Sequence, residues 1–344
     1  MSVAKEIPIT EMISWLGEYL RGQSTMGESD KITSIRQLDG GWSRDTYLIL
    51  SEVMGSARKF IARVESGGGL TGTPLETEYL IYRDLQEFNL KTPRVFAYQS
   101  SGENPFGGPF FLMDHLEGDA PNLWRWEVHP ELKANWADNK SLANDFVSSL
   151  AAIHLIDDDH APRSLPRTNY LDLIKKWRLL YAENFIARDP FIEEAFIWLE
   201  ENSPKPGRHG LVHGDFRLGN LLIQDSRILG IIDWELAHVG DVNYDLGYVS
   251  LKYVAGKHLY SKTNLLSGVC DREWFFDEYE RLTGDSVDRE SVDWWSVLTL
   301  AALIVMSMIG FHAFSVGATT DIRRIWSRWA MPGLRQEMTQ IAKW

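Results

Sequence analysis

The stretch that decides the fold is HGDFRLGN, residues 213–220, with GIIDWE following at residues 230–235. Two short apolar runs, separated by the polar pair Asp225-Ser226, lie between Asn220 and Asp233. This pattern predicts a β-hairpin. Asp215 and Asn220 lie in the loop that enters this hairpin, and Asp233 ends its second strand. We therefore expect the three side chains to converge at one end of the hairpin.

Carboxylate and amide oxygens gathered in this way suit a hard divalent cation such as Mg²⁺. The alternative is structural, with Asp215 and Asn220 capping turns and Asp233 capping the end of a strand. His213 is interpreted as a residue that holds the loop. Glu235, two residues after Asp233, either assists the metal or hydrogen-bonds the backbone, and the sequence does not choose between these roles.

Upstream of the hairpin, roughly the first hundred residues are typical of strands with one main helix. Two extended runs flank a glycine pair in KITSIRQLDGGWSRDTYLIL, residues 31–50, and ARKFIARVE, residues 57–65, alternates between two faces. PLETEYLIYRDLQEF, residues 74–88, has helical spacing with proline at its first turn. A further helix is expected at about residues 9–22.

Downstream of about residue 122 the pattern changes to long amphipathic helices, among them residues 145–157 and 170–187. These patterns together predict an α+β, bilobal fold. Residues 1–113 would form a small antiparallel β-rich N-terminal lobe, and residues 114–344 a larger helical lobe. The uncharged stretch at residues 294–314 is long enough to cross a bilayer, but its polar interruptions favour a buried core helix.

Composition narrows the classes of function. The chain has 344 residues and a formal net charge of −13, which argues against a nucleic-acid-binding protein. Its one cysteine excludes an internal disulfide, a multi-cysteine zinc site and an iron–sulfur cluster. The N-terminus lacks the features of a secretory signal, and a single cysteine fits a reducing cytoplasm, so we expect a cytoplasmic protein. We also expect it to be a monomer or homodimer with no membrane partner.

Six segments in order resemble the aminoglycoside phosphotransferase family, whose fold is protein-kinase-like. Besides the HGDFRLGN and IIDWE pair they are GGWSRDTYLI, FIARV, LETEYLIYRDLQ, PFFLMDHLEG and the flanking LAAIHLID and GDVNYDLGYVS. The closest-looking branch contains hydroxyacid kinases and phosphotransferase domains fused to some acyl-CoA dehydrogenases. The resemblance implies a kinase that moves a phosphoryl group from ATP or GTP to a small-molecule hydroxyl.

The resemblance also assigns roles at the catalytic loop. Asp215 would orient the acceptor hydroxyl and accept its proton, and Arg217 would stabilise the transferring phosphoryl group. Asn220 and Asp233 would be the Mg²⁺ ligands. Asp241 and Asp245, in the GDVNYD motif, are expected to cap a helix or brace the loop rather than bind metal.

The nucleotide site is expected in the N-terminal lobe. Arg63 occupies the strand position where protein kinases have lysine, and Glu78 on the next helix is its expected partner; a surface salt bridge is the alternative. Gly40, Gly41 and Ser43 resemble the family's nucleotide loop, although a plain hairpin turn fits the glycine pair nearly as well. The resemblance places the nucleobase against the backbone of Met113, Asp114 and His115.

Other classes of function stay open. A metal-dependent hydrolase would share short acid and glycine motifs, but its several metal-binding histidines are missing. A non-catalytic pseudokinase is disfavoured by the intact Asp215, Asn220 and Asp233. An anionic acceptor such as a hydroxy acid or hydroxyacyl-CoA is favoured over an aminoglycoside. The candidate cations to bind it are Lys175, Lys176, Arg178, Arg323, Arg324 and Arg328. A solvated helix face explains these cations equally well.

Overall fold

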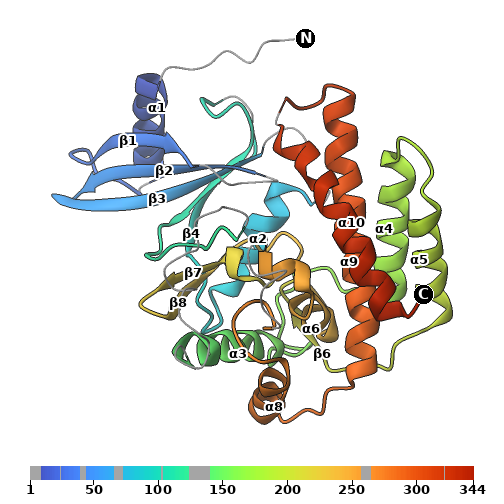
Figure 1. Ribbon diagram of the computed structural model, residues 1–344. Coiled ribbons are helices and arrows are strands. Elements are labelled where there is room, and N and C mark those ends of the chain that lie inside the picture. The colour runs from blue at the N-terminus through green and yellow to red at the C-terminus, as the bar shows by residue number, and fades with distance from the viewer. Residues whose placement is uncertain are drawn as a thin grey trace. The chain divides into compact units, whose positions relative to one another are not determined.

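The computed structural model describes residues 9–23, 25–38, 44–65, 73–101, 104–123, 140–256, 265–320 and 322–344, without the side chains of residues 323 and 326–329. The chain divides into two compact units (Figure 1). The first comprises residues 1–86 and 93–116, and the second comprises residues 87–92 and 117–344. The expected boundary after residue 113 lies three residues before residue 116, where the first unit ends. The sequence did not indicate that the short segment 87–92 belongs to the second unit.

The first unit contains an antiparallel five-stranded sheet in the order β1-β2-β3-β5-β4. Its elements are α1 (Ile9–Gly22), β1 (Lys31–Gln37), β2 (Arg44–Val53), β3 (Ser56–Glu65), α2 (Leu75–Leu85), β4 (Val95–Gln99) and β5 (Phe110–Asp114). The helix expected at about residues 9–22 and the helix beginning after Pro74 are both present.

The two helices of this unit cover opposite faces of the sheet. Phe110 packs against Trp15 of α1, whereas Phe111 packs against Tyr82 of α2. Successive side chains of a strand point to opposite faces, so neighbours in β5 meet different helices. The same alternation in β3 buries Ala62 and Val64 in the core with α1. It turns Arg63, which lies between them, towards the face of the sheet that α2 covers.

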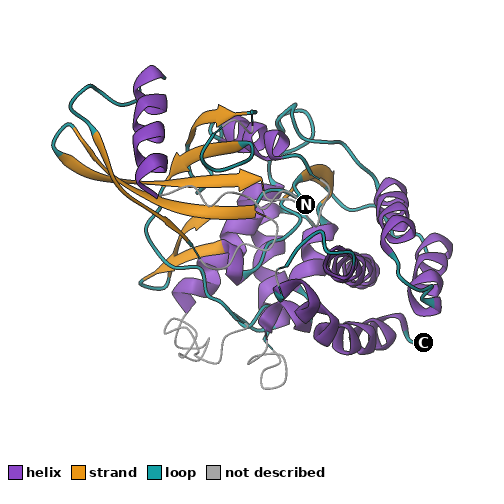
Figure 2. Cartoon of the chain, turned by 90° about the horizontal axis from the view of Figure 1, so that it is seen from above, coloured by secondary structure: helices purple, strands orange, loops and turns teal. Residues whose placement is uncertain are grey.

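The second unit is mainly helical. Figure 2 draws the helices of the chain in purple and its strands in orange. Its helices are α3 (Lys140–His154), α4 (Tyr170–Asn184), α5 (Pro190–Glu201), α6 (Asn243–Val249), α8 (Arg272–Thr283), α9 (Arg289–Ser315) and α10 (Arg323–Ala342), with short turns η2 (Leu218–Asn220) and η3 (Lys252–Ala255). Two small antiparallel sheets pair β6 (His209–Val212) with β9 (His238–Asp241) and β7 (Leu221–Gln224) with β8 (Arg227–Ile231).

The long apolar helix α9 lies among the other helices of its unit, packing against α4, α5, α6 and α10. Its most apolar window has a mean hydropathy of 2.1, and 61% of that window is buried inside the structure. Length and composition alone would allow this helix to cross a membrane, but the core helix of a soluble protein passes the same test. The burial supports the core-helix interpretation.

Candidate active site

The β7–β8 hairpin brings the HGDFRLGN and IIDWE motifs together. Asp225 and Ser226 form its two-residue turn with φ values of 51° and 59°, the left-handed conformation that tight hairpins favour. In this register Leu221 lies opposite Ile231, and the next backbone pair is Ile232 N donating to Asn220 O at 3.0 Å. Asn220 and Asp233 therefore lie at the same end of the hairpin, as the sequence predicts.

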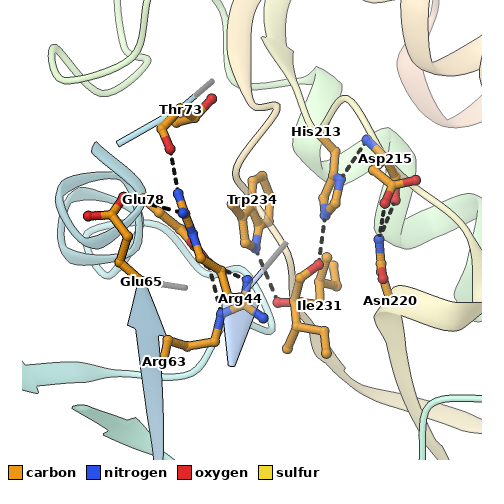
Figure 3. A network of polar contacts seen from close by, with 11 residues as sticks. Arg44, Arg63, Glu65, Thr73, Glu78, His213, Asp215, Asn220, Ile231 and Trp234 are labelled. Carbon is orange, nitrogen blue, oxygen red and sulfur yellow. Dashed lines mark hydrogen bonds and ion pairs between the residues drawn. The ribbon is translucent and has the colours of Figure 1, made fainter. Parts of the chain in front are cut away.

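Asn220 is fixed directly on Asp215. Its Nδ2 donates to the backbone carbonyl of Asp215 at 2.9 Å and to the carboxylate Oδ2 at 2.6 Å (Figure 3). The asparagine is buried, with 3% of its surface exposed. Because both amide hydrogens are used on Asp215, the amide Oδ1 is the atom left to act as a ligand.

Two further side chains hold the other oxygen of the Asp215 carboxylate. Arg217 Nε donates to Oδ1 at 3.0 Å, and the Tyr248 hydroxyl donates to the same oxygen. Burial, together with the negative charge of Asp215, raises the pKa of Tyr248 well above its ordinary value, so this hydroxyl is a donor. Tyr248 comes from α6 and was not anticipated from the sequence.

Asp245, also on α6, braces the backbone at the start of the HGDFRLGN loop. Its carboxylate accepts from the backbone N–H groups of His213 at 2.7 Å and Gly214 at 2.8 Å, and contacts His154 Nε2 at 3.1 Å. Burial alone would raise the pKa of Asp245, but these hydrogen bonds and the nearby histidines hold that pKa below its ordinary value. This geometry fits the bracing role expected for the GDVNYD acids.

His213 links the loop to the segment that carries Asp233. Its Nδ1 accepts from the backbone N–H of Asp215 at 3.1 Å, and its Nε2 lies 3.2 Å from the carbonyl of Ile232 (Figure 3). Burial lowers the pKa of His213, so the ring is neutral with Nε2 as donor. Both ring nitrogens are used on the backbone, which supports a structural role.

Asp233 itself adopts φ 71°, the left-handed region that a non-glycine residue occupies at a cost of about 1–2 kcal/mol. The next residue, Trp234, anchors this bend. Its indole Nε1 donates to Ile231 O at 3.1 Å, and its ring lies 4.4 Å from that of His213. The chain therefore bends at Asp233, two residues after β8 ends at Ile231.

In the first unit, Glu78 lies between two arginines rather than one. Arg63 Nε and Nη2 approach Glu78 Oε1 at 3.2 and 2.8 Å, and Arg44 Nε lies 3.6 Å from Oε2 (Figure 3). Glu78 is fully buried, so the alternative of a surface salt bridge is wrong. Arg44 also approaches Glu65 and donates to the carbonyl of Thr73.

Comparison with known families matches residues 34–261, more than half of the chain, to the phosphotransferase enzyme family. The chain belongs to the phosphotransferase enzyme family. Membership groups it with phosphotransferase enzymes. The family expected from the HGDFRLGN and IIDWE motifs is thereby confirmed.

One relative of this phosphotransferase is the protein named probable acyl-CoA dehydrogenase IBR3 of Arabidopsis thaliana, 26% identical over 322 residues. The match covers 86% of this chain but only 36% of the relative, so the chain spans about a third of that protein. The relative's name agrees with the expected branch of domains fused to acyl-CoA dehydrogenases.

Solved structures show the fold. A protein of Ralstonia eutropha JMP134 assigned to the aminoglycoside phosphotransferases has a TM-score of 0.71 at 18% identity, covering 96% of this chain and 98% of its own. A thermostable mutant of the aminoglycoside phosphotransferase APH(4)-Ia, in ternary complex with ADP and hygromycin B, has a TM-score of 0.57 at 14% identity, covering 94% and 98%. The predicted α+β, protein-kinase-like fold is confirmed.

Of the remaining residues predicted to bind the nucleotide, the structure describes some and not others. Gly40, Gly41 and Ser43 lie outside the described residues. In β5 and just after it, Asp114 N donates to Arg94 O at 2.8 Å and His115 N donates to Lys59 O at 3.4 Å. These two amides already donate to backbone carbonyls of the chain, so a contribution of 113–115 to nucleobase binding has to come from other backbone groups.

The residues predicted to hold Mg²⁺ have suitable chemistry. Asn220 offers its amide Oδ1 and Asp233 a carboxylate, and Mg²⁺ is commonly held by one or two such protein oxygens together with substrate phosphates. Among the residues that the structure describes, no group of three or more His, Cys, Asp or Glu side chains is arranged as a metal site.

Proposed function

We propose that the chain transfers the γ-phosphoryl group of ATP or GTP to a hydroxyl of a small molecule, with Asp215 as the base. The observation that supports this most is the contact of the buried Asn220 with Asp215, at the end of the hairpin that leads to Asp233. Capping residues need only backbone partners, whereas here two polar side chains are fixed on each other.

In the proposed step the acceptor oxygen forms a bond to the γ-phosphorus while the bond from that phosphorus to the β–γ bridging oxygen breaks. The leaving nucleoside diphosphate keeps the bonding electron pair, and the acceptor proton passes to Asp215. Arg217 uses Nε on Asp215, which leaves the outer nitrogens of its guanidinium to contact the phosphoryl group.

The metal and nucleotide residues have separate tasks in this proposal. Bound Mg²⁺ would neutralise charge on the phosphate oxygens, held by Asn220 and Asp233. In the first unit Arg63 is the residue proposed to contact the nucleotide phosphates, and Glu78 orients it through the bonds at 3.2 and 2.8 Å. The complex of APH(4)-Ia with ADP supports a nucleotide as co-substrate.

For the acceptor we propose a hydroxy acid or hydroxyacyl-CoA, which carries a negative charge. Among the cations expected to bind it, we single out Lys176 on α4. Burial lowers the pKa of Lys176 and the charge of Glu235 opposes that shift, so the lysine lies near the segment that follows Asp233. By contrast, Arg178 pairs with Glu200 at 2.5 Å, and the side chains of residues 323 and 328 lie outside the described set.

The experiment that tests the function is incubation of the pure chain with Mg-ATP or Mg-GTP and a metabolite mixture, followed by mass spectrometry for products heavier by one phosphoryl group. The unaltered chain should form such a product and an equal amount of nucleoside diphosphate, while Asp215→Ala should form neither. Ester cleavage without nucleotide would identify a metal-dependent hydrolase instead. Saturable nucleotide binding without product would identify a pseudokinase, and phosphorylation of aminoglycosides alone would replace the proposed acceptor class.

A further inference from the structure

The two oxygens of the Asp215 carboxylate are held unequally. Oδ1 accepts from Arg217 Nε at 3.0 Å and from the Tyr248 hydroxyl, whereas Oδ2 accepts from Asn220 Nδ2 at 2.6 Å. An ionised carboxylate offers about two lone-pair sites on each oxygen. Among the residues that the structure describes, two donors fill Oδ1, whereas Asn220 is the donor to Oδ2, which keeps a site for one more hydrogen bond.

Tyr248 reaches this oxygen because of its position on α6. It lies three residues after Asp245, and residues three apart share one face of a helix. Asp245 holds the backbone N–H groups of His213 and Gly214, so the same face of α6 fixes both the start of the catalytic loop and the side chain of its aspartate. The tyrosine is 5% exposed, and its neighbours leave the hydroxyl little freedom to seek another partner.

We infer that Tyr248 is a positioning residue that keeps Oδ1 of Asp215 occupied, so that Oδ2 is the oxygen that receives the proton of the acceptor hydroxyl. This inference rests on the proposed phosphoryl transfer. Without the tyrosine hydroxyl, Oδ1 has an open site and the carboxylate can present either oxygen. A misaligned base lowers the rate of the chemical step, whereas nucleotide binding does not involve this contact.

The contact itself is tested without any activity, by a double-mutant cycle in thermal unfolding. Tyr248→Phe keeps the ring and removes the hydroxyl, and should lower the melting temperature by about 2–4 °C in the otherwise unaltered chain. In the Asp215→Ala background the same change should have no further effect, because the partner is gone. Equal shifts in both backgrounds would overturn the contact, and with it the inference.

The positioning role is tested by steady-state kinetics with Mg-ATP, using water and a panel of short hydroxy acids as acceptors. Tyr248→Phe should lower kcat about tenfold and leave the KM for ATP unchanged. Tyr244→Phe is the matched control, because Tyr244 is buried on the same helix but its ring packs against His238 and Trp295. Its kcat should stay at the level of the unaltered chain.

The outcomes separate the possible failures. An unchanged kcat in Tyr248→Phe, or an equal loss in both tyrosine variants, would overturn the positioning role. If the unaltered chain forms no ADP with any acceptor, the proposed function fails, and the unfolding cycle still judges the contact with Asp215. Coupling in the cycle together with a selective loss of kcat supports the inference.

Discussion

The side-chain nitrogen of Asn220 donates to the carboxylate of Asp215 at 2.6 Å and to its backbone carbonyl at 2.9 Å. One residue thus orients the proposed base and, by the same bonds, leaves its own amide oxygen for the metal that we propose it binds. The same hydrogen bonds therefore connect the proposed base, Asp215, with the proposed metal ligand, Asn220. We nevertheless expect the removal of Asp215 to affect proton transfer and the removal of Asn220 to affect metal binding.

Asp215→Ala should lower the rate of phosphoryl transfer by about 10²–10⁴-fold, because the acceptor hydroxyl loses the group that orients it and takes its proton. The affinity for Mg-ATP, measured by isothermal titration calorimetry, should stay within about twofold, since this carboxylate is proposed to contact the acceptor. Asp277→Ala, at an exposed position of α8, is the control and should transfer normally. Retained transfer in Asp215→Ala would remove Asp215 from its proposed role.

Asp233→Ala should instead weaken nucleotide binding that depends on Mg²⁺, because it removes the only carboxylate among the proposed metal ligands. We expect the Kd for ATP at millimolar Mg²⁺ to rise at least about tenfold, a loss of about 1.4 kcal/mol. In the presence of EDTA the variant and the unaltered chain should bind ATP equally weakly. A variant that still responds to Mg²⁺ as the unaltered chain does would exclude Asp233 as a ligand.

Glu78→Gln should destabilise the first unit by about 3 kcal/mol, because it leaves the charges of Arg63 and Arg44 buried without their shared carboxylate. Glu200→Gln is the matched control, since its partner Arg178 lies at the surface and exposed pairs contribute at most about 1 kcal/mol. Urea unfolding followed by circular dichroism measures both changes. Equal effects would mean that the buried pair contributes no more than the exposed one.

The stability of the second unit should fall as the pH falls below about 6.5. Burial lowers the pKa of His238 to about 4, whereas a histidine in the unfolded chain has its ordinary pKa of about 6.5. Between these values the unfolded chain binds the proton and the folded chain does not, so folding loses about 3 kcal/mol from pH 7 to pH 4. His213, whose pKa burial also lowers, acts in the same direction.

Urea unfolding at pH 7.5 and pH 5 checks this prediction. His238→Asn should flatten the dependence on pH, because asparagine keeps a donor for the Leu236 carbonyl without a titrating ring. His160→Asn should leave the acid loss in place, since Asp157 raises the pKa of that exposed histidine and its contribution has the opposite sign. If the free energy of unfolding of His238→Asn depends on pH as steeply as that of the unaltered chain, His238 is not the group responsible for the loss of stability.

Lys176→Met should raise the KM for an anionic acceptor by about tenfold and leave the KM for a neutral alcohol unchanged, because only the former needs the ammonium group. The adjacent Lys175→Met is the control, since Lys175 is exposed on the same helix. Steady-state kinetics with a hydroxy acid and its neutral ester or alcohol compares the two. If both variants raise the KM for the anionic acceptor equally, the acceptor responds to the overall positive charge of the helix and Lys176 does not bind it specifically.

Much of the site could be predicted from the sequence because its parts are local. The spacing from Asp215 to Asn220 is that of one loop, and the hairpin that returns the chain to Asp233 needs only a two-residue turn between apolar runs. In the first unit, the alternation of β3 placed Arg63 on the face opposite Ala62 and Val64, which is the face that meets α2. Backbone periodicity decides these placements before any packing occurs.

Tertiary structure alone decided which distant residues complete the site. Tyr248 lies 33 residues from Asp215 and His154 lies 91 residues from Asp245, and no period or motif joins them. Helical spacing places Tyr248 and Asp245 on one face of α6, but the loop that this face meets depends on how α6 packs. Arg44 likewise follows a glycine pair in sequence and reaches Glu78 only because the strands β2 and β3 are paired. The sequence determined the family, the local geometry and the identity of the proposed base, whereas packing between distant segments decided which groups surround it.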